Sequence, residues 1–403
     1  MERRTRVLLV ADAITLAHLA RPAALAAGLD PDRYDVSLAY DPRLSGFIRQ
    51  PGFAELPLES MPSERFLANA ARGAPLYDAD TLRRYVRSDL ALLESLRPDV
   101  VIGDHRLSLS VSARCAGVPY LALINAYWSP YTVRRRLLVP ELPMTRVLGV
   151  SMAQGLFRAA WPIASAIQSA PLNRVRKEYG LPSLGSDWFK VYTDADRTLY
   201  VDAAELVPTR DLPASHRYLG PVMWSPDVGL PAWWADILPD RPVIYATMGS
   251  SGRPGVLEMV LEALAGLEVS VLATTAGKSR PSSVPANAWL VDYAPGDKLA
   301  ARADLMICNG GSLTVYQSLA AGKPVLGVAA HMDQQLSMSY VESAGVGCSL
   351  RSDTLTTDRL RSATDRLLND ASLRSRAGAM AGAIAGYDPV QRLTAVIEEV
   401  VHG

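Results

Sequence analysis

Cysteine, net charge and long apolar runs are all scarce in this sequence of 403 residues. Its three cysteines, Cys115, Cys308 and Cys348, are too few and too scattered for a disulfide framework, and none lies in a C-x-x-C metal or redox pair. We therefore expect a reducing, cytoplasmic location. Lysine plus arginine and aspartate plus glutamate both number 41, so net charge gives no reason to expect nucleic acid or a strongly anionic membrane surface as a partner.

No apolar run of about 18 or more residues is free of charge, so a membrane-spanning helix is not expected. The N-terminal apolar run that starts at Val7 is interrupted early by Asp12, His18 and Arg21, which favours a first sheet strand over a signal peptide. With 49% hydrophobic and 20% charged residues, the chain has the composition of a globular enzyme long enough for two domains.

Strand-like and helix-like segments alternate along the chain, which predicts an α/β fold with parallel sheets flanked by helices. A Pro-, Trp- and Gly-rich stretch separates two such series. It predicts an N-terminal domain at 1–218, a linker at 219–242, a C-terminal domain at 243–387 and a last helix within 388–403. The expected strands are 7–10, 35–40, 100–103, 120–124, 198–201, 243–247, 269–274, 288–291, 305–308 and 325–328, with clear helices at 81–96 and 390–401.

The most informative segment runs from Leu305 to Gln335. A buried strand ending at Cys308 is followed by Asn309 and two glycines, Gly310 and Gly311, which let backbone amides approach a ligand. A helix then opens at Ser312 or Thr314, and such a helix start attracts phosphate because its first amides lack partners and its dipole end is positive. After the next strand, the short polar groups of Asp333 and Gln334 suit sugar hydroxyls.

This segment resembles the donor signature of GT-B glycosyltransferases of the UDP-glycosyltransferase-like family (family 1), written H-x-G-x-G-T, E-A-L, G-x-P and D-Q. It departs from the signature at three positions: Asn309 stands for the phosphate-binding His, Leu313 for Gly, and Gln317 for the ribose-binding Glu. The resemblance implies two Rossmann-like domains facing each other across a cleft, with the last helix packing back on the first domain. It places the nucleotide-sugar donor on the C-terminal domain and the acceptor on the N-terminal one.

Two further segments resemble donor-binding loops of this family. Gly249, Ser250 and Ser251 follow a strand and are similar to a G-S loop near the donor diphosphate, while Tyr293 and Ala294 lie in a loop that carries a base-stacking residue in relatives. The donor-binding residues implied by the resemblance are Gly249, Ser250, Ser251, Tyr293, Ala294, Asn309, Gly310, Gly311, Ser312, Thr314, Gln317, Asp333 and Gln334.

His18 lies near the start of the first helix, in a segment similar to the family's G-H-x-x-P element, with Ala17 in place of Gly. In that family the His is the general base, and imidazole suits the task because its ordinary pKa lets it accept a proton at neutral pH. Asp104 resembles the carboxylate that orients this His, and two strand ends would bring the pair together. From the residues alone, Asp104 could instead cap the helix that starts at Leu109, and His105 could serve as the partner or as a decoy.

Two D-x-D triplets, 78–80 and 194–196, are interpreted as a helix start and a turn, and no metal is predicted. Arg134, Arg135 and Arg136 could grip an anionic or aromatic acceptor or form a solvated helix face. Trp161, Trp188 and Met152 could line an apolar acceptor pocket or fill the core.

These features together predict an inverting, metal-independent glycosyltransferase without a cofactor. Its donor would be a nucleotide diphosphate sugar, UDP- or TDP-linked, and its acceptor a hydroxyl of a small, largely apolar natural product or lipid. Two alternatives stay open at this point: a GT-B-like sugar-nucleotide epimerase, and a catalytically degenerate binding partner, the latter motivated by Asn309, Leu313 and Gln317. The oligomeric state is not predicted.

Overall fold

The computed structural model describes residues 3–48, 52–133, 137–238 and 240–403. Contacts divide the chain into two compact units. Unit 1 comprises the described residues of Met1–Arg135, Leu142–Val222 and Tyr387–Gly403, and unit 2 those of Arg136–Glu141 and Met223–Gly386. This division groups residues 137–141 with the C-terminal unit, and it cuts the predicted linker after Val222.

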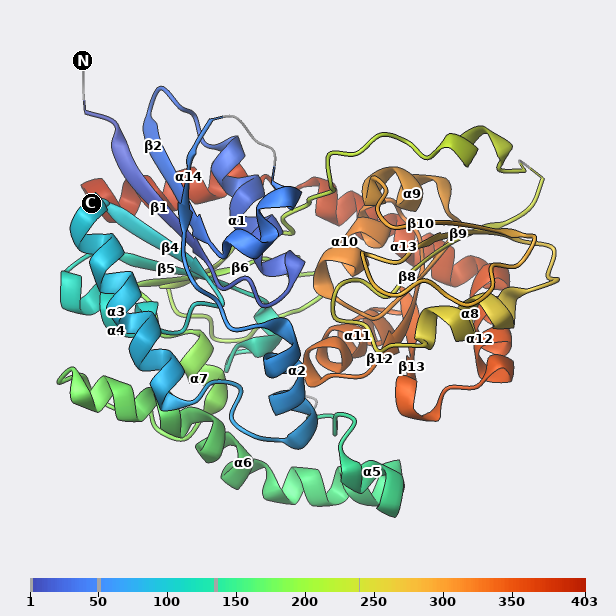
Figure 1. Cartoon of the computed structure of the whole chain (residues 1–403), viewed down its shortest axis with the longest axis horizontal. Helices are drawn as coiled ribbons and strands as arrows, with labels where there is room; N and C mark the ends of the chain where they lie inside the picture. Colours follow the sequence, from blue (N-terminus) through green and yellow to red (C-terminus); the bar gives the residue numbers. More distant parts are fainter. Residues whose placement is uncertain (1–2, 49–51, 134–136, 239) are drawn as a thin grey trace. The chain divides into compact units, whose positions relative to one another are not determined.

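Unit 1 is built on a seven-stranded parallel sheet of order β3-β2-β1-β4-β5-β6-β7 (Figure 1). Along β1, Val7 and Leu9 belong to the core on one face, while Leu8 and Val10 belong to the core on the other. Because successive side chains of a strand point to opposite faces, an uninterrupted apolar run suits a sheet that is covered on both sides. The strands are β1 (Thr5–Ala11), β2 (Tyr34–Tyr40), β3 (Ala54–Pro57), β4 (Val100–Asp104), β5 (Tyr120–Ile124), β6 (Arg197–Tyr200) and β7 (His216–Tyr218).

Helices cover both faces of this sheet. The core of one face includes Leu19 and Leu25 of α1 (Leu16–Gly28) and Ile397 of α14 (Pro389–His402), so the end of the chain belongs to unit 1. The other face is covered by α3 (Ala79–Leu96) and α4 (Leu109–Ala116), through Leu93 and Leu109. The remaining helices of the unit are α2 (Ser63–Arg72), α5 (Pro143–Leu148), α6 (Val150–Glu178) and α7 (Trp188–Tyr192).

Unit 2 carries a six-stranded parallel sheet of order β10-β9-β8-β11-β12-β13 (Figure 1). Its strands are β8 (Val243–Thr247), β9 (Ser270–Thr274), β10 (Ala288–Val291), β11 (Leu305–Cys308), β12 (Val325–Ala329) and β13 (Gly347–Arg351). Its helices are α8 (Val256–Leu264), α9 (Gly296–Arg302), α10 (Ser312–Ala320), α11 (Met332–Ala344), α12 (Thr357–Asn369) and α13 (Ala371–Ala385). The central strands β8 and β11 are adjacent, which brings the loops after Thr247 and Cys308 to one edge of the sheet.

The predicted α/β class is confirmed, and four strands (β5, β8, β10 and β11) have the predicted bounds. The other predicted strands and the helices α3 and α14 differ by one or two residues at their ends. Strands β3, β7 and β13, which lie at sheet edges, were not predicted. Within the described ranges, no helix is long and apolar enough to cross a membrane.

Candidate functional site

In unit 1, the structure brings His18 and Asp104 together. Strands β1 and β4 are parallel neighbours, with Ala11 opposite Asp104, and α1 begins five residues after β1 ends. The Nδ1 atom of His18 lies 2.8 Å from Oδ1 of Asp104, whose side chain is fully buried. The helix-cap alternative for Asp104 is wrong, because the residue at the N-cap of α4 is Ser108.

Arg21, one turn after His18 on α1, is a member of this cluster that sequence reasoning did not single out. Its Nη2 atom donates to Oδ1 of Asp104 at 2.9 Å, and its Nε atom forms an ion pair with Oδ2 at 2.8 Å. Its Nη1 atom donates to Asn125, at 2.9 Å, and Asn125 in turn donates to the buried Asp202. The i, i+3 spacing of a cation and a His was the available signal, because such residues share a helix face.

The same Nη2 atom of Arg21 lies 2.9 Å from Nδ1 of His18. A guanidinium can only donate, so Nδ1 either donates a hydrogen bond to Asp104 or accepts one from Arg21. The first arrangement leaves the lone pair of Nε2 available to take a proton, whereas the second puts a proton there. The carboxylate of Asp104 therefore decides whether this histidine can act as a base.

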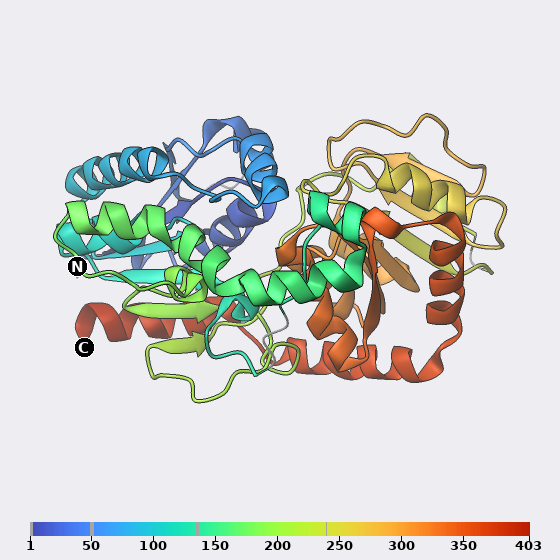
Figure 2. The ribbon, with the colours of Figure 1, turned by 90° about the horizontal axis from the view of Figure 1, so that it is seen from below.

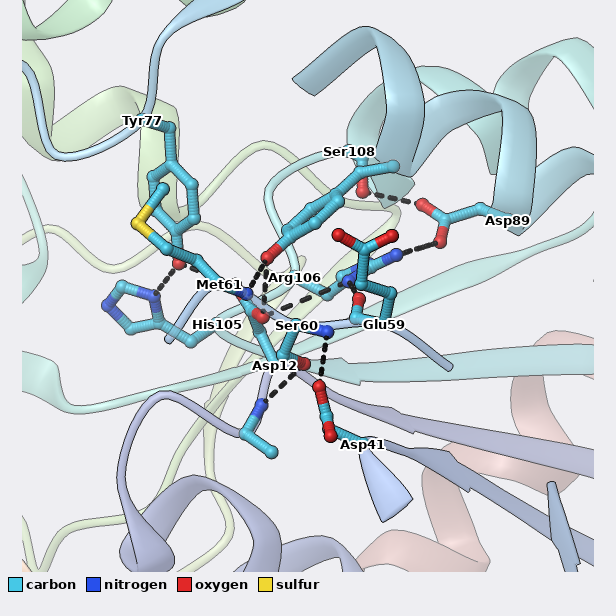
Figure 3. Close-up of polar contacts among 12 residues, drawn as sticks. Asp12, Asp41, Glu59, Ser60, Met61, Tyr77, Asp89, His105, Arg106 and Ser108 are labelled. Carbon is cyan, nitrogen blue, oxygen red and sulfur yellow. Dashed lines mark hydrogen bonds and ion pairs between the residues drawn. The ribbon is translucent and has the colours of Figure 1, made fainter. Parts of the chain in front are cut away.

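His105 lies beside this cluster without contacting Asp104 through a hydrogen bond of its ring. Its ring centroid is 4.6 Å from that of His18, and its Nδ1 atom is 3.4 Å from the hydroxyl of Tyr77 (Figure 3). Burial, aided by the nearby charges of His18 and Arg21, lowers the pKa of His105 well below its usual value of 6.5. The partner of Asp104 is thus His18, and His105 is held as a neutral neighbour.

Tyr77 connects His105 to a buried polar network behind the cluster (Figure 3). Its hydroxyl donates to Oδ2 of Asp12 at 2.5 Å, and burial raises the pKa of that carboxyl. Arg106, which is fully buried, donates to Asp89 at 2.9 Å and lies 3.8 Å from Asp12. These contacts hold the loops after β1 and β4 against each other and so fix the backbone that carries the cluster.

Aromatic side chains continue from His105 into an apolar cluster of unit 1. The ring of Tyr192 lies 5.1 Å from that of His105 and 5.0 Å from that of Trp128, and Trp188 packs 5.2 Å from Trp128. Trp188 is buried and Trp161 half-buried, so both belong to this cluster, whereas Met152 is 59% exposed and does not fill the core. Arg134, Arg135 and Arg136 lie outside the described residues.

In unit 2, three strand ends bring part of the predicted donor site together. After β11, the Nδ2 atom of Asn309 donates to Oγ of Ser251, 3.2 Å away in the loop after β8. After β12, the Nε2 atom of Gln334 lies 3.4 Å from the same oxygen. Neighbouring parallel strands place their carboxyl-end loops side by side, which is the expected position of a ligand site in such sheets.

Two glycines shape this edge. Gly249 and Gly310 both adopt positive φ, 56° and 82°, which L side chains rarely allow. A Cβ atom at Gly310 would lie 2.6 Å from Cγ of Met338, so only glycine fits the turn that leads into α10. The N-cap residue of α10 is Gly311, which has no side chain to cap the first turn that begins at Ser312 and includes Thr314, and such a helix start suits an anion.

Asn309 also closes its own loop, because its Oδ1 atom accepts a hydrogen bond from the amide of Gly311 at 3.1 Å. The motif did not predict this contact, which occupies a backbone amide that the resemblance places at the donor phosphate. A phosphate bound at that amide would have to displace the Asn309 side chain.

The other predicted donor residues lie around this edge. Gln317, on α10, donates from Nε2 to the carbonyl of Trp224 at 2.7 Å, and it packs against Gly296, the first residue of α9, which follows the loop of Tyr293 and Ala294. Oε1 of Gln334 accepts from the amides of residues 330 and 331 at 2.9 and 3.3 Å, so this amide oxygen caps the start of α11. Asp333 lies in the first turn of the same helix.

The two D-x-D triplets have structural partners. Asp78 caps α3 by accepting from the amide of Thr81 at 2.7 Å, as the helix-start interpretation expected. Asp194 pairs with Arg114 and Arg176. Among the described residues there is no group of three or more His, Cys, Asp or Glu side chains that could hold a metal ion.

Comparison with known proteins identifies the class of enzyme. The model of the erythromycin biosynthesis protein CIII-like C-terminal domain matches residues 258–398. The chain is 49% identical over 381 residues to a PGL/p-HBAD biosynthesis glycosyltransferase of Mycobacterium tuberculosis, covering 94% of this chain and 89% of that protein. It is also 49% identical over 388 residues to a PGL/p-HBAD biosynthesis rhamnosyltransferase of Mycobacterium bovis, covering 96% and 86%.

The fold resembles that of the spinosyn forosaminyltransferase SpnP, with a TM-score of 0.71 at 20% identity, covering 99% of this chain and 100% of that one. The protein is therefore a glycosyltransferase with the GT-B fold. It belongs to the UDP-glycosyltransferase-like (family 1) glycosyltransferases, and its homologues include the mycobacterial PGL/p-HBAD biosynthesis enzymes. Its substrates are accordingly a sugar nucleotide and a small-molecule acceptor.

Proposed function

We propose that this enzyme transfers a sugar with inversion, and without a metal ion, from a nucleotide diphosphate sugar to a hydroxyl of a small, largely apolar acceptor such as a natural product or lipid. The observation that carries the proposal is the 2.8 Å contact between Nδ1 of His18 and the fully buried carboxylate of Asp104. A carboxylate at Nδ1 prepares the opposite nitrogen, Nε2, to act as a general base.

His18 is the base in this mechanism. As the acceptor oxygen forms its bond to the anomeric carbon, Nε2 of His18 takes the hydroxyl proton, and the bond from that carbon to the diphosphate oxygen breaks with its electron pair. Asp104 stabilises the imidazolium that results and keeps Nδ1 protonated. Attack from the face opposite the leaving diphosphate inverts the anomeric centre.

Unit 2 holds the donor in this proposal. The start of α10, the backbone at Gly310 and Gly311 and the hydroxyls of Ser250 and Ser251 supply positive dipole and hydrogen bonds to the diphosphate, which is why we propose transfer without a metal. Gln317 and the loop of Tyr293 and Ala294 adjoin one another and are assigned to the nucleoside. Asp333 and Gln334 are assigned to the sugar.

The names of the relatives narrow the donor and the pathway. Two proteins at 49% identity are called glycosyltransferase and rhamnosyltransferase of PGL/p-HBAD biosynthesis, which supports a hexosyl or deoxyhexosyl donor and an acceptor from a biosynthetic pathway of that kind. Membership of a transferase family supports transfer over the epimerase alternative. The free cysteines Cys115, Cys308 and Cys348 agree with a reducing cytoplasm, where we place the enzyme.

Nucleotide binding and transfer test the proposal in two steps. Thermal shifts of the full chain are measured with UDP, TDP, GDP and ADP, first with EDTA and then with magnesium. We expect one diphosphate, UDP or TDP, to raise the melting temperature equally in both buffers. Sugars linked to that nucleotide are then assayed with phenolic and lipid acceptors by mass spectrometry. A shift that requires magnesium, or product of retained configuration by NMR, would contradict the proposed chemistry.

A further inference from the structure

Exposed apolar side chains gather on one segment of unit 1. The described chain has eleven large hydrophobic residues with strongly exposed side chains, and six of them lie between residues 147 and 167. These six are Val147 (82% exposed), Leu148 (38%), Met152 (59%), Leu156 (48%), Ile163 (67%) and Ile167 (48%). Such a concentration within 21 residues is not the scatter of single apolar side chains that any protein surface carries.

Four of the six form a strip along α6. Residues eleven apart on an α-helix are separated by just over three full turns and share a face. Met152 and Ile163 are related by this spacing, and so are Leu156 and Ile167. The exposed Ala159, Ala160 and Ala170 fall on or beside the same line, so the strip runs along most of the helix.

The buried residues of α6 point to a different side, where the helix packs on unit 1. They include Ser165, Ser169, Leu172 and Val175, and the helix contacts α3, α5 and α7. In Figure 2, which views the molecule from below, α6 (green) lies in front of the other elements of unit 1. The apolar strip is therefore a surface feature of a helix that is anchored to the unit by its other side.

The charges within this segment have one sign, and Arg174 and Lys177 lie on the side of α6 that carries the strip. Between residues 143 and 177 there is no aspartate or glutamate, whereas Arg146, Arg158, Arg174 and Lys177 are all exposed. Arg174 follows Ile163 by eleven residues, so its positive charge lies on the same face of α6, beyond the C-terminal end of the apolar strip. The first acid after this segment, Glu178, is already paired with Arg83, at 2.6 Å.

We propose that α6 lies on the surface of an anionic lipid bilayer, with its apolar strip entering the headgroup boundary and its cations contacting lipid phosphates. Interfacial helices combine an apolar face with Lys and Arg side chains. Burial of the apolar face and attraction of the cations to anionic lipids both increase the affinity of such a helix for the membrane. The zero net charge of the chain does not oppose this, because the relevant field is local and decays within a Debye length. A second copy of the chain fits less well, since self-pairing of this face would oppose cations to cations.

This inference goes beyond the proposed function and does not rest on its mechanism. It gives the enzyme access to acceptors that partition into membranes, because a surface-bound enzyme meets such molecules at the concentration they reach in the bilayer. The strip and the His18 cluster belong to the same unit.

Vesicle co-sedimentation of the full chain tests the inference. Vesicles of phosphatidylglycerol and phosphatidylcholine are compared with phosphatidylcholine alone, at low salt and in 0.5 M NaCl, about three times physiological ionic strength. We expect binding to the anionic vesicles that weakens with salt. The double variant Arg174→Gln/Lys177→Gln should lower the partition coefficient roughly tenfold to thirtyfold on anionic vesicles. Ile163→Ser/Ile167→Ser should lower it at least about tenfold at both salt concentrations.

The matched control is Val228→Ser/Leu230→Ser, which removes two apolar side chains of unit 2 that are 41% and 51% exposed. It should bind vesicles like the unaltered chain, and melting curves should show that all variants remain folded. Absence of vesicle binding by the unaltered chain, or an equal loss in the control, would overturn the proposal. Dimerisation in light scattering that disappears in Ile163→Ser/Ile167→Ser would also overturn it, in favour of a second copy as the occupant.

Discussion

The substitution Asp104→Asn tests the proposed catalytic cluster most directly, because it replaces one carboxylate oxygen with an amide nitrogen and leaves the size of this buried side chain unchanged. Nδ1 of His18 has two neighbours at hydrogen-bond distance, Oδ1 of Asp104 at 2.8 Å and Nη2 of Arg21 at 2.9 Å. With asparagine at 104, the carboxylate that holds the Nδ1 proton is gone and the guanidinium remains. The His18 tautomer with its proton on Nε2 is then favoured, and that tautomer cannot take the proton from the hydroxyl of the acceptor substrate.

The magnitude follows from the role of the base. General-base catalysis contributes about 10²-fold to 10⁴-fold, so we expect kcat to fall by about 10²-fold to 10³-fold, with little change in donor KM. The buried Arg21 also loses its ion-pair partner, which costs about 3–5 kcal/mol of folding free energy when a buried pair is broken. Initial rates are therefore measured by product chromatography at saturating donor, well below the melting temperature of the variant.

The control for network damage is Asp202→Asn. Asp202 is also fully buried, and it accepts from Asn125, which is itself bound to Arg21, but it is separated from His18 by two residues of the network. It should lose stability and keep kcat within about threefold of the unaltered enzyme. If Asp104→Asn retained kcat within threefold while folded, or if both variants lost activity equally, the assignment of Asp104 as the residue that orients His18 would be refuted.

Three further predictions concern other parts of the chain. Asn309→His releases the amide of Gly311 and should change turnover or donor preference by about twofold to tenfold, the value of one hydrogen bond; unchanged kinetics would mean that position 309 does not lie beside the phosphate. Gly310→Ala should lower the free energy of unfolding by about 1–3 kcal/mol and weaken nucleotide-induced thermal shifts, whereas Gly229→Ala, whose added methyl meets no atom within 4 Å, should do neither. Burial lowers the pKa of His216 to about 4, below its unfolded value of 6.5. As the pH falls from 6.5 to 4, this histidine is therefore protonated in the unfolded chain but stays neutral in the folded chain. Stability is lost over that window, by about 1–2 kcal/mol after allowance for partial exposure; His216→Gln should therefore show a smaller drop in melting temperature between pH 7 and pH 5, and an identical drop would contradict this.

Much of the fold was predictable because the central strands carry their own signal. The apolar runs of β8 and β11 are bounded by glycine, proline and polar residues, and their burial on both faces requires no knowledge of the partner strand. The edge strands β3 and β7 lack this signal. In β3 (Ala54–Pro57) no residue is buried, and β7 (His216–Tyr218) has three residues, so both depend on pairing with a neighbour that the sequence does not reveal.

The candidate site was predictable where a position in the topology determines a neighbour. His18 and Asp104 follow adjacent parallel strands, so the meeting of their side chains could be expected from strand order alone. Arg21 could not be assigned in the same way. An arginine on the first helix has many possible partners, and only the packed structure shows its guanidinium between Asp104, Asn125 and His18.

Asn309 illustrates the remaining limit. The motif predicted a polar residue at the phosphate position. The side-chain amide of an asparagine there can either bind a ligand or form hydrogen bonds within its own loop. In the structure the Asn309 side chain bonds to its surroundings, to the amide of Gly311 and to the hydroxyl of Ser251. Neither contact changes the order or spacing of the motif residues, so the motif does not reveal them. A motif specifies which atoms are available at a turn, whereas the competition among their partners depends on energies of about 1 kcal/mol, which residue types alone do not determine. Donor affinity in this enzyme should therefore depend on how readily the Asn309 side chain leaves its loop.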